Sequence, residues 1–138
     1  MIERVVFDTS TLVGAVIRPE SIPWQALRRA FLSSEVCATA ETLAEMEEVL
    51  ERSKFDRYLD RPTRRAAAEQ IRRDCRMFVM DRVDAAPPCR DPRDNKFLAL
   101  ALVADAGAII SSDEDLLTLH PWRGIRVLTP TQFLAESE

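Results

Sequence analysis

Short runs of apolar residues alternate along this chain with longer segments whose apolar residues recur every three or four positions. The run Val5-Val6-Phe7, inside a predicted strand over residues 2–7, shows no alternation with polar residues. This pattern is typical of a strand buried on both faces of a parallel sheet. Residues 108–111 have the same character, and further strands are predicted over residues 35–38, 78–80 and 125–128.

The segments between these strands carry apolar residues at helical spacing, which predicts helices there. Helices are predicted over residues 23–32, 40–52, 63–78 and 130–135, from the entrance at Asp91 and Asp94 to Gly107, and from Leu116 to Pro121, with a shorter piece around Phe55 and Tyr58 that stops before Pro62. Strands that alternate with helices indicate the α/β class. We therefore expect a single domain, residues 1–138, built as a three-layer α/β/α sandwich around a central, mainly parallel sheet.

Charge balance and cysteine content narrow the class of protein. The net charge is −4, the pI is about 5.1, and every cationic side chain except Lys54 and Lys96 is an arginine. A weakly acidic chain is a poor passive binder of nucleic acid, although its arginines can form a local basic patch. Three cysteines without a C-x-x-C pair favour reduced thiols in the cytoplasm. We expect no signal peptide and no membrane-spanning segment, because Glu3 and Arg4 interrupt the N-terminus and no apolar run is long enough.

Asp8 stands where the first predicted strand ends, and Thr9, Ser10 and Thr11 follow it. Ligands of open α/β sheets bind at the carboxyl ends of the strands, so a carboxylate followed by hydroxyl groups is a candidate polar site. The alternative is that Asp8 or Ser10 only caps the next helix.

Acidic side chains occupy comparable positions elsewhere in the chain. Asp113 follows the strand over residues 108–111, Asp94 lies at a helix entrance, and the glutamate-rich helix after residue 39 can supply Glu45. Convergence of these carboxylates is electrostatically unfavourable unless a cation binds among them. Oxygen ligands favour Mg²⁺ or Mn²⁺ over zinc. Such an ion suits phosphodiester hydrolysis, because it activates water and neutralises phosphate charge.

The chain carries four motifs in a specific order: V-V-F-D-T-S, E-M-E-E-V-L-E-R-S-K-F, D-P-R-D-N-K-F-L-A-L-A-L and I-I-S-S-D-E-D-L-L. Together they cover nearly the whole chain and resemble the PIN-domain ribonucleases that act as toxins of bacterial and archaeal toxin–antitoxin pairs. The resemblance implies an RNA substrate, Mg²⁺ or Mn²⁺ as cofactor, a cognate antitoxin and a homodimer. Trp24, Phe55, Tyr58 and Trp122 are the apolar side chains that we expect to serve such contacts.

Carried over residue by residue, the catalytic and metal-binding site of that family falls on Asp8, Glu45, Asp94 and Asp113. Ser10 and Ser111 match the hydroxyl groups that accompany it, although the family often has Thr where Ser111 stands. Glu45 is preferred to Glu47 and Glu48, because it borders the apolar stripe of its helix. Asp91 and Asp115 are further carboxylates nearby: Asp91 is a candidate helix cap and Asp115 a candidate additional ligand.

RNA binding next to an acidic site requires cations around it. Arg90 and Arg93 flank the helix entrance that carries Asp94, and Arg93 is the better candidate for a phosphate contact. The arginines between residues 57 and 76 are interpreted as a solvated face paired with nearby acidic residues, namely Asp56, Asp60, Glu69 and Asp74. The alternative is a phosphate-contacting rim.

Two other functions are compatible with parts of this pattern. A phosphoaspartyl phosphatase would use Asp8 as nucleophile. By resemblance to that family, a second Asp is expected two residues later, where this chain has Ser10. A catalytically silent PIN-like module would bind RNA or a protein without cutting. Four carboxylates kept together without a metal argue against that module.

Overall fold

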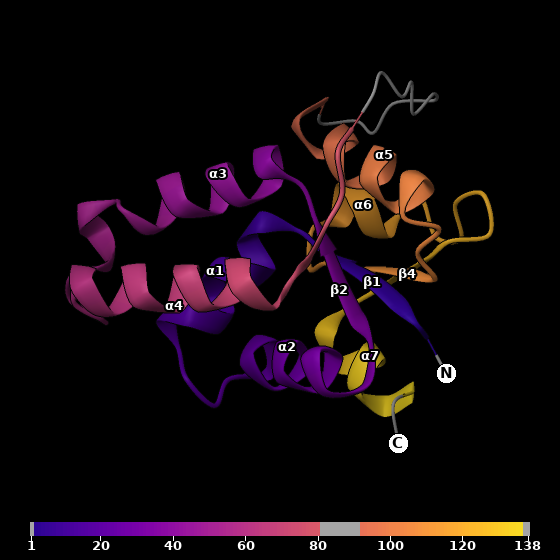
Figure 1. The fold of residues 1–138 in the computed structure, drawn as a ribbon. Coiled ribbons are helices and arrows are strands. Elements are labelled where there is room, and N and C mark those ends of the chain that lie inside the picture. The colour runs from indigo at the N-terminus through magenta and orange to yellow at the C-terminus, as the bar shows by residue number, and fades with distance from the viewer. Residues whose placement is uncertain (1, 81–91, 137–138) are drawn as a thin grey trace.

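The computed structural model describes residues 2–80 and 92–136 (Figure 1). The predicted loop around Pro87 and Pro88, together with Arg90 and Asp91, lies outside the described residues. Within them, no helix is long and apolar enough to cross a membrane.

The centre of the fold is a sheet of five parallel strands in the order β3-β2-β1-β4-β5. The strands are β1 (Arg4–Phe7), β2 (Glu35–Ala38), β3 (Arg76–Met77), β4 (Ala108–Ile110) and β5 (Arg126–Leu128). Strand β1 is the central strand, and it pairs with β4 so that Phe7 lies opposite Ile110. The predicted parallel sheet is therefore confirmed.

Helices cover both faces of this sheet, which confirms the three-layer sandwich (Figure 1). The helices are α1 (Thr9–Ile17), α2 (Ile22–Ser33), α3 (Ala40–Leu50), α4 (Arg61–Asp74), α5 (Asn95–Val103), α6 (Glu114–Leu117) and α7 (Pro130–Glu136), with short 3-10 turns η1 (Ser53–Phe55) and η2 (Pro92–Asp94). Val5 and Phe7 face a core formed with α1, α2, α3, α4 and α7. Val6 faces the second core, formed with α5 and α6.

Several predicted boundaries were wrong. Helix α6 covers Glu114–Leu117 rather than Leu116 to Pro121, because Asp113 caps it, and α3 ends at Leu50 rather than at residue 52. Helix α4 covers Arg61–Asp74 rather than residues 63–78, because Asp60 caps its first turn by accepting a hydrogen bond from the Thr63 backbone. The strand expected over residues 78–80 is instead Arg76–Met77, paired with Cys37 and Ala38. Helix α5 ends at Val103, before Gly107, and the backbone turns at Asp105 in the left-handed region.

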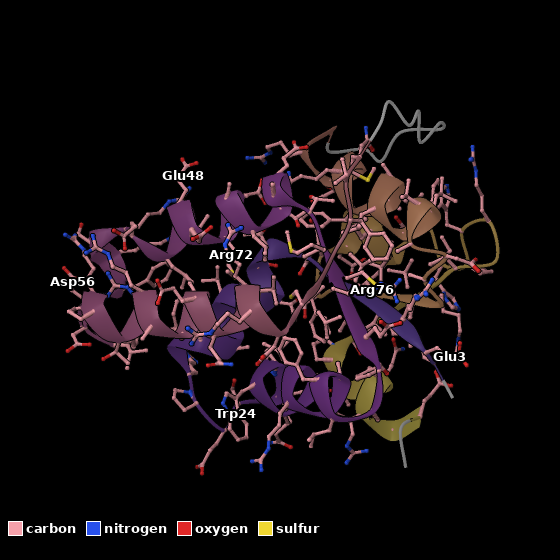
Figure 2. All side chains as sticks on the ribbon, viewed as in Figure 1. Glu3, Trp24, Glu48, Asp56, Arg72 and Arg76 are labelled. Atoms are coloured by element: carbon pink, nitrogen blue, oxygen red, sulfur yellow. The ribbon has the colours of Figure 1, made fainter. Side chains whose placement is uncertain are left out.

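The arginine-rich segment is mostly paired, but of the predicted partners only Asp56 forms an ion pair with it among the described residues. Arg65 pairs with Glu51, Arg72 with Glu47, and Arg76 with Glu35. Figure 2 places Arg72 between α3 and α4, where that pair is made. The acidic partners come mainly from α3 and β2, because α4 packs beside α3 in space.

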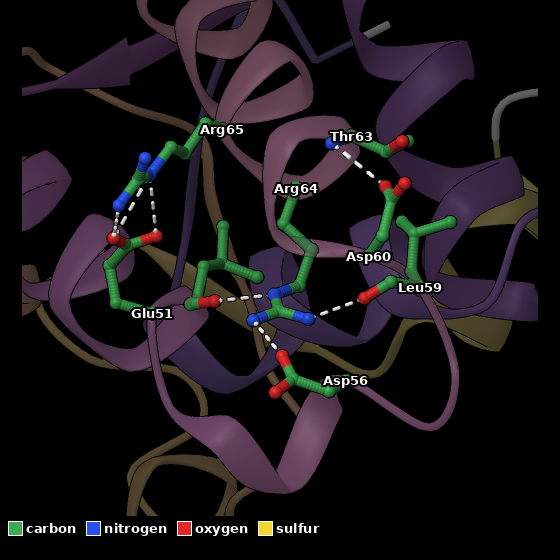
Figure 3. Close-up of polar contacts among 8 residues, drawn as sticks. Glu51, Asp56, Leu59, Asp60, Thr63, Arg64 and Arg65 are labelled. Carbon is green, nitrogen blue, oxygen red and sulfur yellow. Dashed lines mark hydrogen bonds and ion pairs between the residues drawn. The ribbon is translucent and has the colours of Figure 1, made fainter.

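Arg64 is fully buried, which the expectation of a solvated arginine face missed. Its Nε donates to the Leu50 carbonyl at 2.6 Å, and its Nη1 donates to the Leu59 carbonyl (Figure 3). Its Nη2 pairs with Asp56 at 2.8 Å. Leu50 is the last residue of α3, whose final carbonyls have no partner within the helix. The guanidinium therefore ties the end of α3 to the turn that leads into α4.

We predict that Arg64→Met lowers the free energy of unfolding by about 2–4 kcal/mol, because the Leu50 and Leu59 carbonyls lose their donor. Urea denaturation measures the change. The adjacent substitution Arg65→Ala removes an exposed pair with Glu51 and should move the urea midpoint little. Equal effects of the two substitutions would contradict the assignment of Arg64 as the structural clamp.

Candidate active site

A cavity of about 740 Å³ opens at the carboxyl edge of the sheet, and Asp8, Glu45, Asp94 and Asp113 all line it. Asp8 follows β1 directly, while Asp113 lies three residues beyond the end of the neighbouring strand β4. Glu45 comes from α3, and Asp94 comes from the turn that precedes α5. The structure thus brings four residues far apart in the sequence to one cavity.

Asp8 is the most buried of these carboxylates, with an exposed fraction of 3 %. Its Oδ1 accepts the Thr11 backbone N–H at 2.9 Å, so it also caps α1. Its Oδ2 accepts the hydroxyl groups of Ser111 at 2.5 Å and Ser10 at 3.3 Å. Burial raises the pKa of Asp8, and the hydrogen bonds from Ser111, Thr11 and Ser10 offset part of that rise. Both interpretations of Asp8, a helix cap and a cavity carboxylate, therefore describe it.

Ser111 connects the two strand-end carboxylates. It is fully buried, donates to Asp8, and its Oγ accepts the Asp113 backbone N–H at 2.9 Å. The Asp113 Oδ1 in turn accepts the Asp115 backbone N–H at 2.9 Å, which caps α6. Asp115 itself is outside the cavity lining. The hydroxyl at position 111 therefore fixes Asp8 and Asp113 relative to each other.

Glu45 is held by two residues that sequence analysis did not single out. The Thr9 hydroxyl donates to its Oε1, and the Lys96 ammonium lies 2.6 Å from its Oε2. Lys96 also donates to the Arg93 carbonyl at 2.6 Å. Position 96 is two residues after Asp94, but no spacing rule predicts a contact with α3. Only the packing of α5 near α3 reveals it.

The other predicted residues divide between the cavity and its surroundings. Ser10 and Arg93 line the cavity, and so does Glu48, to which Glu45 was preferred. Glu47 is outside the lining and pairs with Arg72. The choice of Glu45 stays a prediction, with Glu48 as a neighbour in the same cavity.

The donor chemistry of the cavity suits a hard divalent cation, because all five of its acidic residues, Glu48 included, offer oxygen atoms. In the arrangement described, however, no three His, Cys, Asp or Glu side chains within residues 2–80 and 92–136 stand close enough to ligate one ion. Glu45 satisfies its charge with Lys96. The acidic residues match Mg²⁺ or Mn²⁺ in type of ligand, and Lys96 supplies a positive charge beside Glu45.

Comparison with known proteins agrees with the fold and motifs. Residues 4–115 match the PIN domain family. An uncharacterised protein of Methanocaldococcus jannaschii is 30% identical over 149 positions, which cover 98% of this chain and 92% of that protein.

A solved structure also matches. The crystal structure of PAE2754 from Pyrobaculum aerophilum superposes with a TM-score of 0.61 and 12% identity, covering 98% of this chain and 89% of that one. At that identity the similarity establishes the fold alone. The family match spans most of the chain and includes every cavity carboxylate, and PIN domains are generally nucleases. The chain belongs to the PIN domain family.

Proposed function

We propose that this protein is a metal-dependent endoribonuclease, and that it acts in the cytoplasm as the toxin of a toxin–antitoxin pair. One observation carries the proposal: Asp8, Glu45, Asp94 and Asp113 line a single open cavity at the carboxyl edge of the sheet. Family membership supports nuclease chemistry. The oxygen ligands support Mg²⁺ or Mn²⁺ as the cofactor.

The side chains have separable roles in this proposal. Asp8, Asp94 and Asp113 would hold the ion, which when bound lowers the pKa of water and neutralises phosphate charge. Ser111 keeps the Asp8 carboxylate in one orientation. Glu45, fixed by Thr9 and Lys96, orients the attacking water and accepts its proton. Arg93 lines the cavity and binds a phosphate of the strand.

A second candidate function is supported by the same cavity. The ion pair between Lys96 and Glu45 neutralises one carboxylate without a metal, as a non-cutting PIN-like module that binds RNA or a protein would require. The phosphatase alternative is weaker, since Ser10 stands where that class needs an acid and the family match is to PIN domains.

We predict that the purified protein cleaves RNA with Mg²⁺ or Mn²⁺, and that EDTA abolishes cleavage. Asp94→Asn should lower the rate at least about 100-fold, because one charged oxygen ligand is lost. Gel analysis of a labelled RNA measures the rate. Asp105→Asn, an exposed Asp after α5 and outside this cavity, is the matched control and should cut normally. Undiminished cleavage by Asp94→Asn and Asp8→Asn would exclude the carboxylates as the site, and no cleavage by the wild type would favour the silent module.

We also predict that Asp8→Asn raises the melting temperature in EDTA at pH 7 by a few degrees. The folded-state pKa of Asp8 is raised, so ionisation costs stability as the pH rises above the ordinary carboxyl pKa of about 3.9. A neutral Asn avoids that cost and keeps an oxygen for the Thr11 N–H. The advantage should disappear as the pH falls toward about 4, where the wild-type carboxyl is protonated too.

Asp8→Ala provides the contrast, because it removes the charge and the helix cap together. The lost cap costs about 1 kcal/mol, so Asp8→Ala should melt below Asp8→Asn. A melting temperature of Asp8→Asn below that of the wild type at pH 7 would mean that the charged form stabilises the fold.

The toxin role predicts growth arrest when the chain is expressed alone. Sequencing of RNA ends should find new cut sites with the wild type and none with Asp94→Asn. Normal growth with intact RNA would contradict the role, and an antitoxin should restore growth.

We further propose that two copies form a homodimer, which light scattering of the purified chain tests. Trp122 is only 6 % exposed and belongs to the core, so the expectation that it serves such a contact was wrong. Tyr58 is 45 % exposed and Phe55 is half-buried, but both line the cavity of the candidate active site, so half-buried Trp24 remains the candidate for the contact between copies.

A further inference from the structure

We propose that the end of the cavity away from the carboxylates is a binding subsite for an unpaired stretch of the RNA strand. This subsite consists of Arg18, Arg52 and Lys54, which bind phosphates, and of Phe55 and Tyr58, which stack on bases. All five residues line the same cavity as Asp8 and Glu45. The inference rests on the proposed function in taking the ligand to be RNA.

One face of α1 and one face of α3 line the cavity. Helix α3 contributes Glu45, Glu48 and Val49, and Arg52 follows two residues after the end of the helix at Leu50. At a rise of 1.5 Å per residue, Glu45 and Leu50 are separated by about 7.5 Å along the axis, and Arg52 lies beyond that end of the helix. That span is the length of about two stacked nucleotides. A strand cut at the acidic end can therefore reach Arg52.

The wall from α1 repeats the arrangement. Ser10, Val13, Gly14 and Ile17 line the cavity, and Arg18 follows at the C-cap of the helix. Both walls thus run from an acidic end to a cationic end. A strand that binds along them would place phosphates beside Arg18 and Arg52 and would reach the carboxylates at the other end.

The cations of this subsite are available for phosphates. Among residues 2–80 and 92–136, no carboxylate forms an ion pair with Arg18, Arg52 or Lys54. In the neighbouring helix α4, by contrast, acidic partners form ion pairs with Arg64, Arg65 and Arg72. Arg18, Arg52 and Lys54 are all exposed. Since the protein is acidic overall, these local charges are what can attract a polyanion.

Aromatic rings lie among these cations. The Arg18 guanidinium carbon is 5.6 Å from the centroid of the Tyr58 ring, and the Lys54 ammonium is 5.1 Å from that of Phe55. Aromatic rings beside cations are the elements that bind single-stranded nucleic acid, since bases stack on the rings while phosphates meet the charges. A base paired in a duplex cannot offer its face to Tyr58. The subsite therefore selects single strands.

The buried clamp keeps this subsite in place before RNA binds. Arg64 holds the carbonyls of Leu50 and Leu59, and the segment between those two residues carries Arg52, Lys54, Phe55 and Tyr58. Asp56, in the middle of the segment, is held by the same guanidinium (Figure 3). A segment fixed in advance loses less entropy on binding.

Fluorescence anisotropy in Ca²⁺, with a labelled RNA of about 12 nucleotides, tests the proposal without cleavage. Arg18→Ala and Arg52→Ala should each weaken binding roughly tenfold and reduce the salt slope by about one. Arg65→Ala is the matched control, because that arginine lies in the neighbouring helix α4, outside the cavity, and is paired with Glu51. It should bind as the wild type does. Thermal melts confirm that each variant is folded.

A second pair of variants tests stacking. Tyr58→Ala should weaken binding of the RNA about tenfold and leave the salt slope unchanged. The same substitution should not change the affinity for an abasic strand. Tyr58→Phe keeps the ring and should bind the RNA as the wild type does. Wild-type affinity and salt slope in both arginine variants would overturn the proposal, as would equal affinity for duplex and single strand. These outcomes are independent of catalysis. If RNA binding depends on Arg52 but the protein never cleaves RNA, the subsite is supported and the nuclease function is rejected. If the protein cleaves RNA and both arginine variants bind it normally, the nuclease function is supported and the subsite is rejected.

Discussion

The pairing of β1 with β4 is the constraint on which the cavity depends. Because Phe7 lies opposite Ile110, the chain leaves both strands at the same edge, and Asp8 and Ser111 come out side by side. The Asp8 N–H donates to the Ile110 carbonyl at 3.2 Å, and the Ser111 hydroxyl donates to Asp8 at 2.5 Å. A change of one residue in this register would turn Val5, Val6 and Phe7 toward the wrong cores and would move Asp8 out of reach of Ser111.

Repulsion between carboxylates is the main electrostatic feature of the same cavity. Five acidic residues line one cavity, and burial raises the pKa of Asp8, so the charged state of Asp8 is costly without compensation. Hydroxyl groups and backbone N–H groups supply part of that compensation at Asp8, while Lys96 supplies a full positive charge at Glu45. In the proposed mechanism, metal and substrate therefore meet a site whose carboxylates are already oriented.

Much of this arrangement could be predicted from the sequence, since strand ends of a parallel sheet meet at one edge. That rule predicted the shared location of Asp8 and Asp113, and a helix entrance predicted Asp94. Contacts between helices could not be predicted in this way, because they depend on how α3, α4 and α5 are rotated about their axes. Thr9 and Lys96 at Glu45, and the burial of Arg64, are contacts of that kind. In the sequence Arg64 is one arginine among many, and only the depth of its guanidinium separates it from Arg65.

The edges of the sheet have a consequence for how copies of the protein meet. Strand β3 has two residues and β5 has three, and Arg76 and Arg126 begin them. Such short, charged borders expose few unsatisfied backbone groups, so a neighbouring chain gains little by adding a strand there. Self-association through a continuous intermolecular sheet is thereby disfavoured. The brevity of the outer strands is thus a safeguard against aggregation when the protein is abundant.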